Sequence, residues 1–307
     1  MKKTDSLWYR LWHYRPAAIS LTVILLYLLL AVGFECADIV CRCRNIVPLP
    51  LQSWGGVYSP PSLTHLLGTD YQGRDVLLRA AAASATALKV GVISGLVAGF
   101  IGTFLGMLAG YFGKRTDELV VWLYSTFASI PSLLFILALA LLVSRGFLPA
   151  PINEFIRTAG VVLNTEPGTL AVYCAIGLTG WVSLCRVVRS ESMKLKKMPY
   201  IEAAKVSGTG NFTILFRHVL PNVFHLVIIY FTLNFAGAVM LEVIVSYLGF
   251  GVQSAPSWGV MISDGQERLW RGVWWEITAA TGFMFILVLA LNVLGDALRD
   301  LLDPKNR

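Results

Sequence analysis

Residues 85–112 read ATALKVGVISGLVAGFIGTFLGMLAGYF, and Lys89 is the only charged residue among them. An α-helix rises about 1.5 Å per residue, so a helix of this length exceeds the roughly 30 Å hydrocarbon core of a bilayer. Apolar runs of about 18 residues or more are typical of transmembrane helices. This stretch therefore predicts that the chain crosses a membrane.

The composition of the whole chain supports the same conclusion. Of its 307 residues, 56% are hydrophobic and 14% are charged, whereas soluble domains have about 25% charged residues. This composition excludes a disordered chain, a small disulfide-rich secreted protein and an ordinary soluble enzyme.

Six apolar blocks have the length of a transmembrane helix. They cover residues 16–35, 85–112, 119–143, 169–188, 223–250 and 277–298. We predict an all-α polytopic membrane protein with six transmembrane helices and a core of residues 85–298. The remaining segments are an interfacial N-terminal segment (1–15), an outer loop (36–84), a cytoplasmic loop (189–222), a further outer loop (251–276) and a tail (299–307). The long basic lead before the first block favours a retained helix over a cleaved signal peptide.

The net charge of +7 is explained by where the basic residues lie. Sixteen of the 25 Lys and Arg residues fall in the N-terminal segment, the turn at 113–118, the segment from Arg186 to Arg217 and the C-terminal tail. Because basic residues are retained on the cytoplasmic side, both termini and the 189–222 loop are expected in the cytoplasm. That loop has few aromatic residues between its basic ones, so the expected partner is the lipid bilayer and not nucleic acid.

Several residues within the apolar blocks have candidate roles in transport. The candidates for a translocation pathway are Ser129, Pro131, Asn234 and Glu242. Pro131 removes a backbone hydrogen bond and should bend its helix. An intramembrane carboxylate such as Glu242 is costly and by default suggests function, although a structural role near the end of its helix fits as well.

The second block also carries six glycines in two series with a spacing of four residues. They are Gly91, Gly95, Gly99, Gly102, Gly106 and Gly110. Such a stripe of small residues lets another helix approach closely. It is compatible both with a moving or subunit-facing interface and with static packing inside one subunit.

Five cysteines are present, and three of them lie close together. Cys36, Cys41 and Cys43 fall on the expected outer side, where one local disulfide is permitted if the compartment is oxidising. Free thiols fit the sequence equally well, and a metal site fits poorly because no histidine lies nearby. Cys174 and Cys185 lie in an apolar block and are expected to be core residues.

The chain lacks the sequence features of an ATPase or an intramembrane hydrolase. The nearest approach to a Walker A loop, Gly113-Lys114-Arg115, has neither the upstream glycine nor the following Ser or Thr. Ser94-Gly95 superficially resembles a nucleophile site, but no histidine or carboxylate with a partner role lies at a matching depth. We therefore expect no catalytic residue, bound cofactor or metal on this chain.

One cytoplasmic segment carries a long motif. It reads Tyr200-Ile201-Glu202-Ala203-Ala204-Lys205-Val206-Ser207-Gly208 and continues to His218-Val219-Leu220-Pro221-Asn222. This pattern resembles the EAA loop of ABC importer permeases. The spacing matches at Glu202, Ala203, Ala204, Gly208, Leu220 and Pro221, while His218 departs from the Ile of the general pattern. Physically, two alanines give a short helix a flat surface that can lie in a groove of another protein, and Gly208 lets the chain turn.

Three further segments resemble the same family. They are HLLGTDYQGRD (65–75), YLGFG followed by PSWG (247–259), and GDALRDLLDPK (295–305). The resemblance is closest to the second, or C-type, permease subunit of oligopeptide, dipeptide and nickel importers. It implies a type I importer permease fold in the bacterial inner membrane.

The resemblance also implies partners and residue roles. The partners would be a second permease in a heterodimer, two cytoplasmic ABC ATPases that hold ATP and Mg, and an extracytoplasmic solute-binding protein. The matching EAA residues would contact the ATPase. Four outer residues would shape a docking surface for the binding protein or brace the outer loops: Asp70, Arg74, Asp75 and Trp258. Peptides are the expected substrates, with nickel, opines, glutathione and murein peptides as alternatives, and an uncoupled channel as a remote one.

Overall fold

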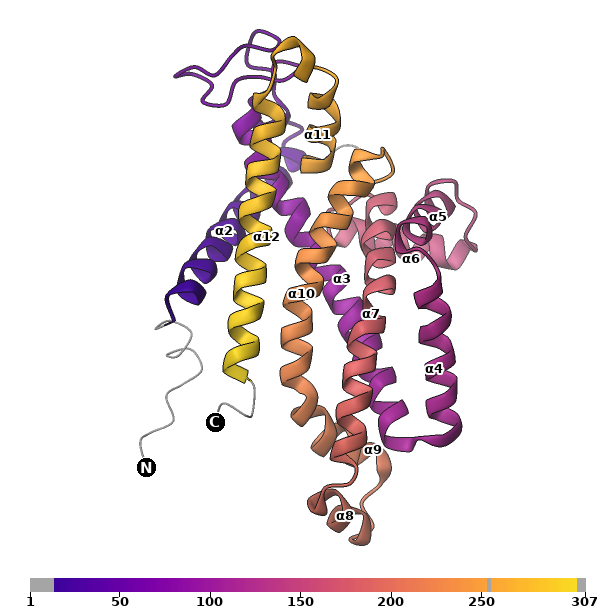
Figure 1. Ribbon diagram of the computed structural model, residues 1–307. Helices are drawn as coiled ribbons and strands as arrows, with labels where there is room; N and C mark the ends of the chain where they lie inside the picture. Colours follow the sequence, from indigo (N-terminus) through magenta and orange to yellow (C-terminus); the bar gives the residue numbers. More distant parts are fainter. Residues whose placement is uncertain (1–13, 253–254, 303–307) are drawn as a thin grey trace.

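The computed structural model describes residues 14–252 and 255–302 (Figure 1). In these residues the regular secondary structure is helical, apart from two isolated β-bridges, Ser53 with Arg74 and Thr69 with Asp75. Except for residues 14–15 and 299–302, the expected N-terminal interfacial segment and C-terminal tail lie outside the described residues.

Within the described residues, five long helices are apolar enough to cross a membrane. They are α2 (Arg15–Cys43), α3 (Val76–Phe112), α7 (Pro167–Leu195), α10 (Leu220–Tyr247, continuous with the turns from Asn211) and α12 (Trp275–Leu302). A sixth span is formed if α4 (Lys114–Ser129) and α5 (Ser132–Ser144) are counted together. The predicted class, an all-α polytopic membrane protein, is confirmed.

The α4–α5 pair is sharply bent where a straight helix over 119–143 was expected. The two helix axes meet at 87° across Ile130 and Pro131. Pro131 has no N–H to continue the hydrogen bonding of α4, and it disfavours a helical conformation at Ile130, whose ψ is 126°. The predicted bend is therefore present, and it divides the block into two separate helices.

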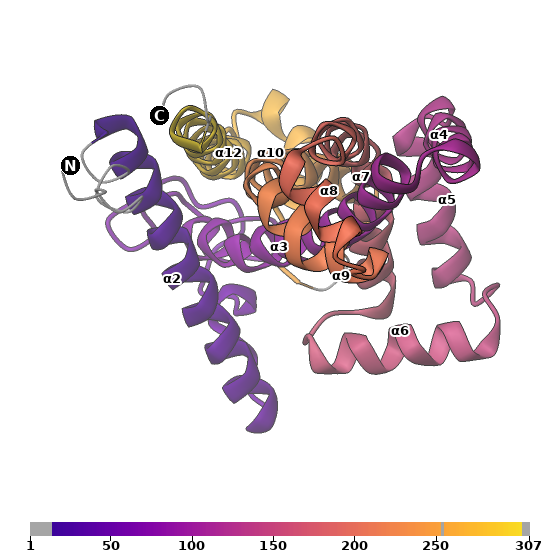
Figure 2. The ribbon, with the colours of Figure 1, turned by 90° about the horizontal axis from the view of Figure 1, so that it is seen from below.

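Shorter helices connect the spans. They are η1 (Leu49–Leu51), α6 (Ala150–Val162), α8 (Pro199–Val206), α9 (Asn211–Ile214), η2 (Leu215–Val219), α11 (Trp258–Gln266) and η3 (Leu269–Arg271). Figure 1 places α8 and α9 at one end of the bundle, here named the α8 end, and α11 with the loop of residues 44–75 at the opposite end, the α11 end. Seen from the α8 end in Figure 2, α8 and α9 lie over the middle of the bundle, with α2 and α6 at its periphery.

Helix α3 begins nine residues before the apolar block that was expected to form it. The carboxylate of Asp75 accepts a hydrogen bond from the backbone N–H of Leu78 at 3.0 Å, which caps the first turn. Residues 76–84, expected in the outer loop, therefore form the first turns of α3. This places Arg79 on a helix that crosses the membrane.

The glycine stripe of α3 packs against other helices of the same chain. A Cβ at Gly102, Gly106 or Gly110 would lie 2.5–2.8 Å from a backbone carbonyl oxygen of α7. A Cβ at Gly91 or Gly95 would collide with a phenylalanine ring of α10. Of the two uses that the sequence left open, the structure shows close helix packing within one subunit.

The three clustered cysteines all lie on α2, which continues to Cys43 instead of ending near residue 35. Along a helix, Cys36 is separated from Cys41 by about 7.5 Å and from Cys43 by about 10.5 Å of rise alone. A disulfide requires Cα atoms within about 6.8 Å. The local bridge is thus excluded by helix geometry, and all five cysteines are free thiols.

Candidate functional site

The EAA segment forms the short helix α8, which extends beyond the ends of the long helices (Figure 1). Pro199 occupies the first helical turn, where its missing N–H costs nothing. Ile201 is the one fully buried side chain of α8 and packs in an apolar cluster with Ile214, Leu215 and Val219. Glu202 and Ala203 are exposed, so α8 is anchored on one side and presents its other side outward.

Gly208 ends α8 in a Schellman motif. Its φ of +77° lies in the left-handed region that favours glycine. The N–H of Gly208 donates to the carbonyl of Lys205, and the N–H of Thr209 donates to the carbonyl of Ala204, both at 3.0 Å. This pair of bonds fixes the direction in which the chain leaves the exposed surface of α8.

The second half of the motif lies where the chain enters α10. Leu215–Val219 form one π-helical turn directly before Leu220 and Pro221. Pro221 cannot donate to the carbonyl four residues earlier, and such a gap is commonly accommodated by a local π or 3₁₀ adjustment. Leu220 is partly buried and Pro221 is exposed, so the Leu-Pro pair shapes the start of α10 and does not lie on the surface of α8.

Of the four pathway candidates, Asn234 lies in a cavity between helices. The cavity has a volume of about 240 Å³, and its polar lining residues are Ser94, Ser132, Thr179 and Asn234. They come from α3, α5, α7 and α10, so the cavity lies where four helices meet. Gly180 leaves room for Asn234, since a Cβ at that glycine would lie 3.1 Å from the amide oxygen.

The other three pathway candidates lie elsewhere. Glu242 is buried outside this cavity, where it accepts hydrogen bonds from the hydroxyls of Ser246 (2.6 Å) and Ser257 (2.9 Å). The bond from Ser257 joins α10 to the N-cap of α11, and the bond from Ser246 lies within α10. Ser129 is exposed and donates to the carbonyl of Ser125, and Pro131 lies at the bend. The sequence did not single out Ser132 or Thr179, whose hydroxyls are common on helix surfaces.

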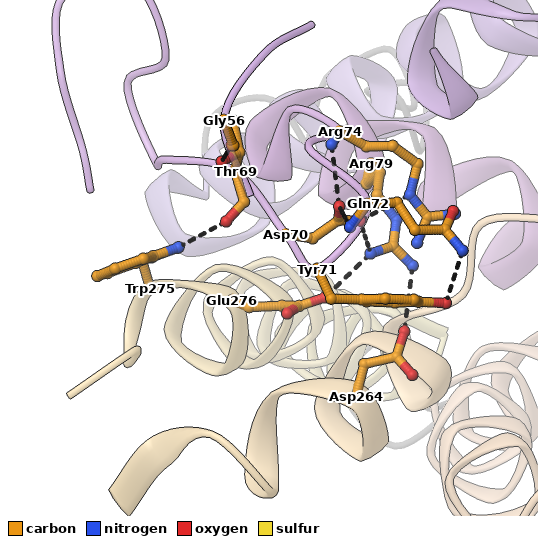
Figure 3. Close-up of polar contacts among 10 residues, drawn as sticks. All are labelled: Gly56, Thr69, Asp70, Tyr71, Gln72, Arg74, Arg79, Asp264, Trp275 and Glu276. Carbon is orange, nitrogen blue, oxygen red and sulfur yellow. Dashed lines mark hydrogen bonds and ion pairs between the residues drawn. The ribbon is translucent and has the colours of Figure 1, made fainter. Parts of the chain in front are cut away.

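The candidates Asp70 and Arg74 belong to a buried charge network at the α11 end (Figure 3). Asp70 accepts from the side chains of Arg74 (Nε, 2.7 Å) and Arg79 and from two backbone N–H groups. Arg79 also donates to Glu276 at 2.9 Å. Since these residues come from the 44–75 loop, α3 and α12, the network joins three parts of the chain.

The network continues to α11 through Asp264, whose Oδ2 lies 3.6 Å from Nη2 of Arg79. Burial raises the pKa of the Asp264 carboxyl above its usual range, and the positive charge of Arg79 opposes that rise. Four buried polar atoms of this network have no hydrogen-bond partner among the described residues: Nη2 of Arg74, Nε of Arg79, Oδ2 of Asp264 and Oε2 of Glu276. The network is therefore held by charge pairing with incomplete hydrogen bonding.

The remaining two outer candidates are also buried. Trp258 is 1% exposed and donates from its indole N–H to the carbonyl of Ala80 at 2.8 Å. Asp75, which caps α3, pairs with Nδ1 of His65 at 2.9 Å. The sequence did not single out Arg79, Trp275 or Glu276. The indole N–H of Trp275 donates to the carbonyl of Thr69 at 3.0 Å, which joins α12 to the loop of residues 44–75.

Comparison with known proteins identifies the family of the chain. The sequence profile of the family described as "binding-protein-dependent transport system inner membrane component" matches residues 102–307. The chain belongs to this family. The match begins within α3 and covers every later helix, including α8 and the cavity residues that lie on α5, α7 and α10.

The similarity of this permease to individual relatives covers almost the whole chain. The oligopeptide transport system permease protein OppC of Escherichia coli strain K12 is 32% identical over 97% of this chain and 90% of its own length. The dipeptide transport system permease protein DppC of Bacillus subtilis strain 168 is 34% identical, over 81% and 71%. The glutathione transport system permease protein GsiD of Pectobacterium atrosepticum is 31% identical, over 80% and 74%. The predicted family, the permease function and the multi-pass location in the cytoplasmic membrane are confirmed.

Proposed function

We propose that this permease is the C-type membrane subunit of an ATP-driven importer of oligopeptides or dipeptides. The observation that carries the proposal is the EAA spacing on α8, a helix with one buried anchor and an exposed surface ended by Gly208. The relatives named for dipeptide and oligopeptide transport support the substrate class. The relative named for glutathione transport makes glutathione, itself a small peptide, the second candidate.

The proposed assembly needs three other chains and a ligand carrier. A second permease completes a heterodimer, two ABC ATPases bind the cytoplasmic side and hold ATP and Mg, and a solute-binding protein delivers substrate from outside. The distribution of basic residues supports a cytoplasmic location for α8 and both termini. We assign ATP hydrolysis to the partner ATPases, because the sequence of this chain has no Walker A loop.

In the proposed mechanism, α8 docks on an ATPase through Glu202, Ala203, Ala204 and Gly208. Closure of the ATPases moves α8, and the permease switches between inward and outward access as a change between discrete arrangements. Leu220 and Pro221 then transmit the displacement into α10. We assign Asn234 to the pathway, and we assign Glu242, Asp70, Arg74, Asp75 and Trp258 to bracing, because their side chains are buried and bonded within the chain.

The coupling role is tested with Gly208→Val in the reconstituted importer. A branched side chain at φ +77° costs about 1–3 kcal/mol and distorts the end of α8. We expect substrate-stimulated ATP hydrolysis to fall while membrane insertion is retained. The matched control is Gly210→Ala, since Gly210 has a φ of −63° and space for a Cβ. Wild-type coupling in an assembled Gly208→Val complex would overturn the assignment.

The substrate class is tested by asking which ligand stimulates ATP hydrolysis. Dipeptides, longer peptides, glutathione and Ni²⁺ are compared with the matching solute-binding protein present. Stimulation by peptides alone supports the proposal, and stimulation by glutathione or Ni²⁺ alone replaces its substrate. Failure of the permease to co-purify with any ATPase would favour an uncoupled channel.

A further inference from the structure

Tyr111, in the last turn of α3, is surrounded by the segment that carries the EAA motif. Its side chain is 3% exposed. The phenolic hydroxyl donates to Oδ1 of Asn211, the first residue of α9, at 2.9 Å. The ammonium nitrogens of Lys196 and Lys205 lie 5.9 and 5.3 Å from the ring centroid, within the range of cation–π attraction.

These three partners come from different parts of one segment. Lys196 lies just after α7, Lys205 lies on α8, and Asn211 begins α9. A single ring of α3 is therefore contacted before, within and after the exposed helix. Any displacement of α8 relative to α3 changes at least one of these contacts.

The environment of Tyr111 adds an apolar connection to the polar ones. Tyr111 belongs to the same buried cluster as Ile201, the anchor of α8. The neighbouring Phe112 packs against Phe212 of α9, with ring centroids 6.2 Å apart. The end of α3 thus contacts both α8 and α9.

Helix α3 is positioned to pass a displacement onward. Gly110 directly precedes Tyr111, and Gly106 lies about one turn earlier. Both bring α3 against the backbone of α7, so the two helices cannot approach more closely. Farther along, Gly91 and Gly95 lie against rings of α10. A displacement of Tyr111 therefore acts on a helix that is packed against two of the other three helices of the cavity, α7 and α10.

We propose that Tyr111 is a positioning residue for energy coupling, which ties the movement of α8 to that of α3 through the bond to Asn211 and the two lysine contacts. This inference rests on the proposed function. It assigns a coupling role to a residue outside the EAA motif and on a membrane-spanning helix. In contrast to Gly208, which shapes the docking helix, Tyr111 acts after docking.

The test compares Tyr111→Leu and Tyr111→Phe in the importer reconstituted with its ATPases and binding protein. Leucine removes the hydrogen bond and both cation–π contacts, and we expect the number of substrate molecules imported per ATP hydrolysed to fall about tenfold. Phenylalanine keeps the ring over both lysines, so it should recover most of that ratio. The matched control is Tyr230→Phe, because Tyr230 packs against the same apolar cluster from α10.

A cycle of Tyr111→Phe with Asn211→Ala isolates the hydrogen bond. Because Tyr111→Phe loses only the hydrogen bond, its remaining loss in the import-to-hydrolysis ratio should disappear when Asn211 is already alanine, and additive effects would overturn the role of that bond. If the Tyr111→Leu complex fails to assemble, the proposal is tested by this cycle together with Lys205→Met, which removes one of the two cation–π contacts. An unchanged ratio in every assembled variant would overturn the inference. If the wild-type complex shows no substrate-stimulated hydrolysis, the proposed function fails instead, before any variant is compared.

Discussion

The two ends of the permease are held together by different kinds of interaction. At the α11 end, Asp70, Arg79 and Glu276 are almost completely buried and join the 44–75 loop, α3 and α12 through ion pairs (Figure 3). At the α8 end, α8 has one fully buried residue, Ile201, and is tied to α3 by the ring of Tyr111. One end is cross-linked by almost completely buried charges. At the other end α8 is held by apolar and aromatic contacts, and the ion pair there, between Arg189 of α7 and Asp117 of α4, is about a fifth exposed.

The difference indicates which end can move. Separating a buried ion pair leaves uncompensated charge and is costly, so the α11 end is confined to a narrow set of arrangements. Apolar packing does not depend on one particular partner, and losing a cation–π contact does not leave a buried charge unpaired. Side chains at the α8 end can therefore shift at a smaller cost in free energy. We infer that displacement starts at the α8 end and that the α11 end is the fixed reference.

The largest expected effect follows from removing the charge at the centre of the α11 end. Arg79→Met keeps a long side chain but leaves Glu276 without its cationic partner. We expect a loss of about 3–5 kcal/mol in stability, because a buried carboxylate remains unpaired. Thermal unfolding of the purified permease in detergent measures the effect.

The control for Arg79→Met is an ion pair of similar geometry in an exposed setting. The Arg42 side chain is 60% exposed and pairs with Asp38 at 2.8 Å. Arg42→Ala should change stability by about 1 kcal/mol or less. Equal effects of the two substitutions would show that burial does not distinguish the ends, and the comparison would fail.

The next effect concerns the backbone contact of α3 with α7 near the α8 end. In Gly110→Ala the new Cβ would lie 2.5 Å from the carbonyl oxygen of Arg189 and 2.6 Å from Cβ of Ser192. The two helices must separate, which we expect to cost about 1–3 kcal/mol.

Gly99→Ala is the matched substitution on the same helix. Apart from the neighbouring backbone of α3 itself, no atom of the described residues lies within 4 Å of a Cβ at Gly99, and alanine favours a helix by about 1 kcal/mol over glycine. We expect Gly99→Ala to be neutral or stabilising in the same unfolding assay. Equal destabilisation by both substitutions would mean that α3 and α7 are not in backbone contact.

The spans and the functional helix could be predicted from sequence because their signals are local. Apolar length alone indicates residues 85–112, and the spacing from Glu202 to Pro221 lies within one segment of the chain. Pro131 likewise predicts a bend, but the angle between α4 and α5 depends on what α5 packs against. Boundaries were less predictable: residues 36–43 contain no helix breaker, so α2 continues through the cysteines and excludes the local disulfide.

The charge network could not be predicted because its pairs are far apart along the chain. Arg79 and Glu276 are separated by 197 positions, and each alone reads as a charged residue at the edge of an apolar block. The sequence singled out Asp70 and Arg74 as part of a motif but did not indicate that they face inward. Tyr111 was missed for a related reason, since an aromatic residue at the end of a span is usual at a membrane interface.

The smallest effect lies at the edge of the charge network, where Asp264 is half-buried. Its pKa is raised in the folded permease, so between the ordinary Asp value near 3.8 and the raised value the folded state binds more protons than the unfolded state. Stability in the wild type is therefore lost as pH rises through this window. Asp264→Asn cannot titrate, and its stability relative to wild type should increase from about pH 4 towards neutral.

Unfolding midpoints of wild type and Asp264→Asn, measured across this pH range, give the difference directly. The opposite trend would mean that attraction to Arg79 outweighs the cost of burying Asp264, and the ion pairing would then extend undiminished into α11. The expected trend would instead set the limit of the fixed region: the core of the network would lie between α3 and α12, and α11 would be the first element of this end that can be displaced.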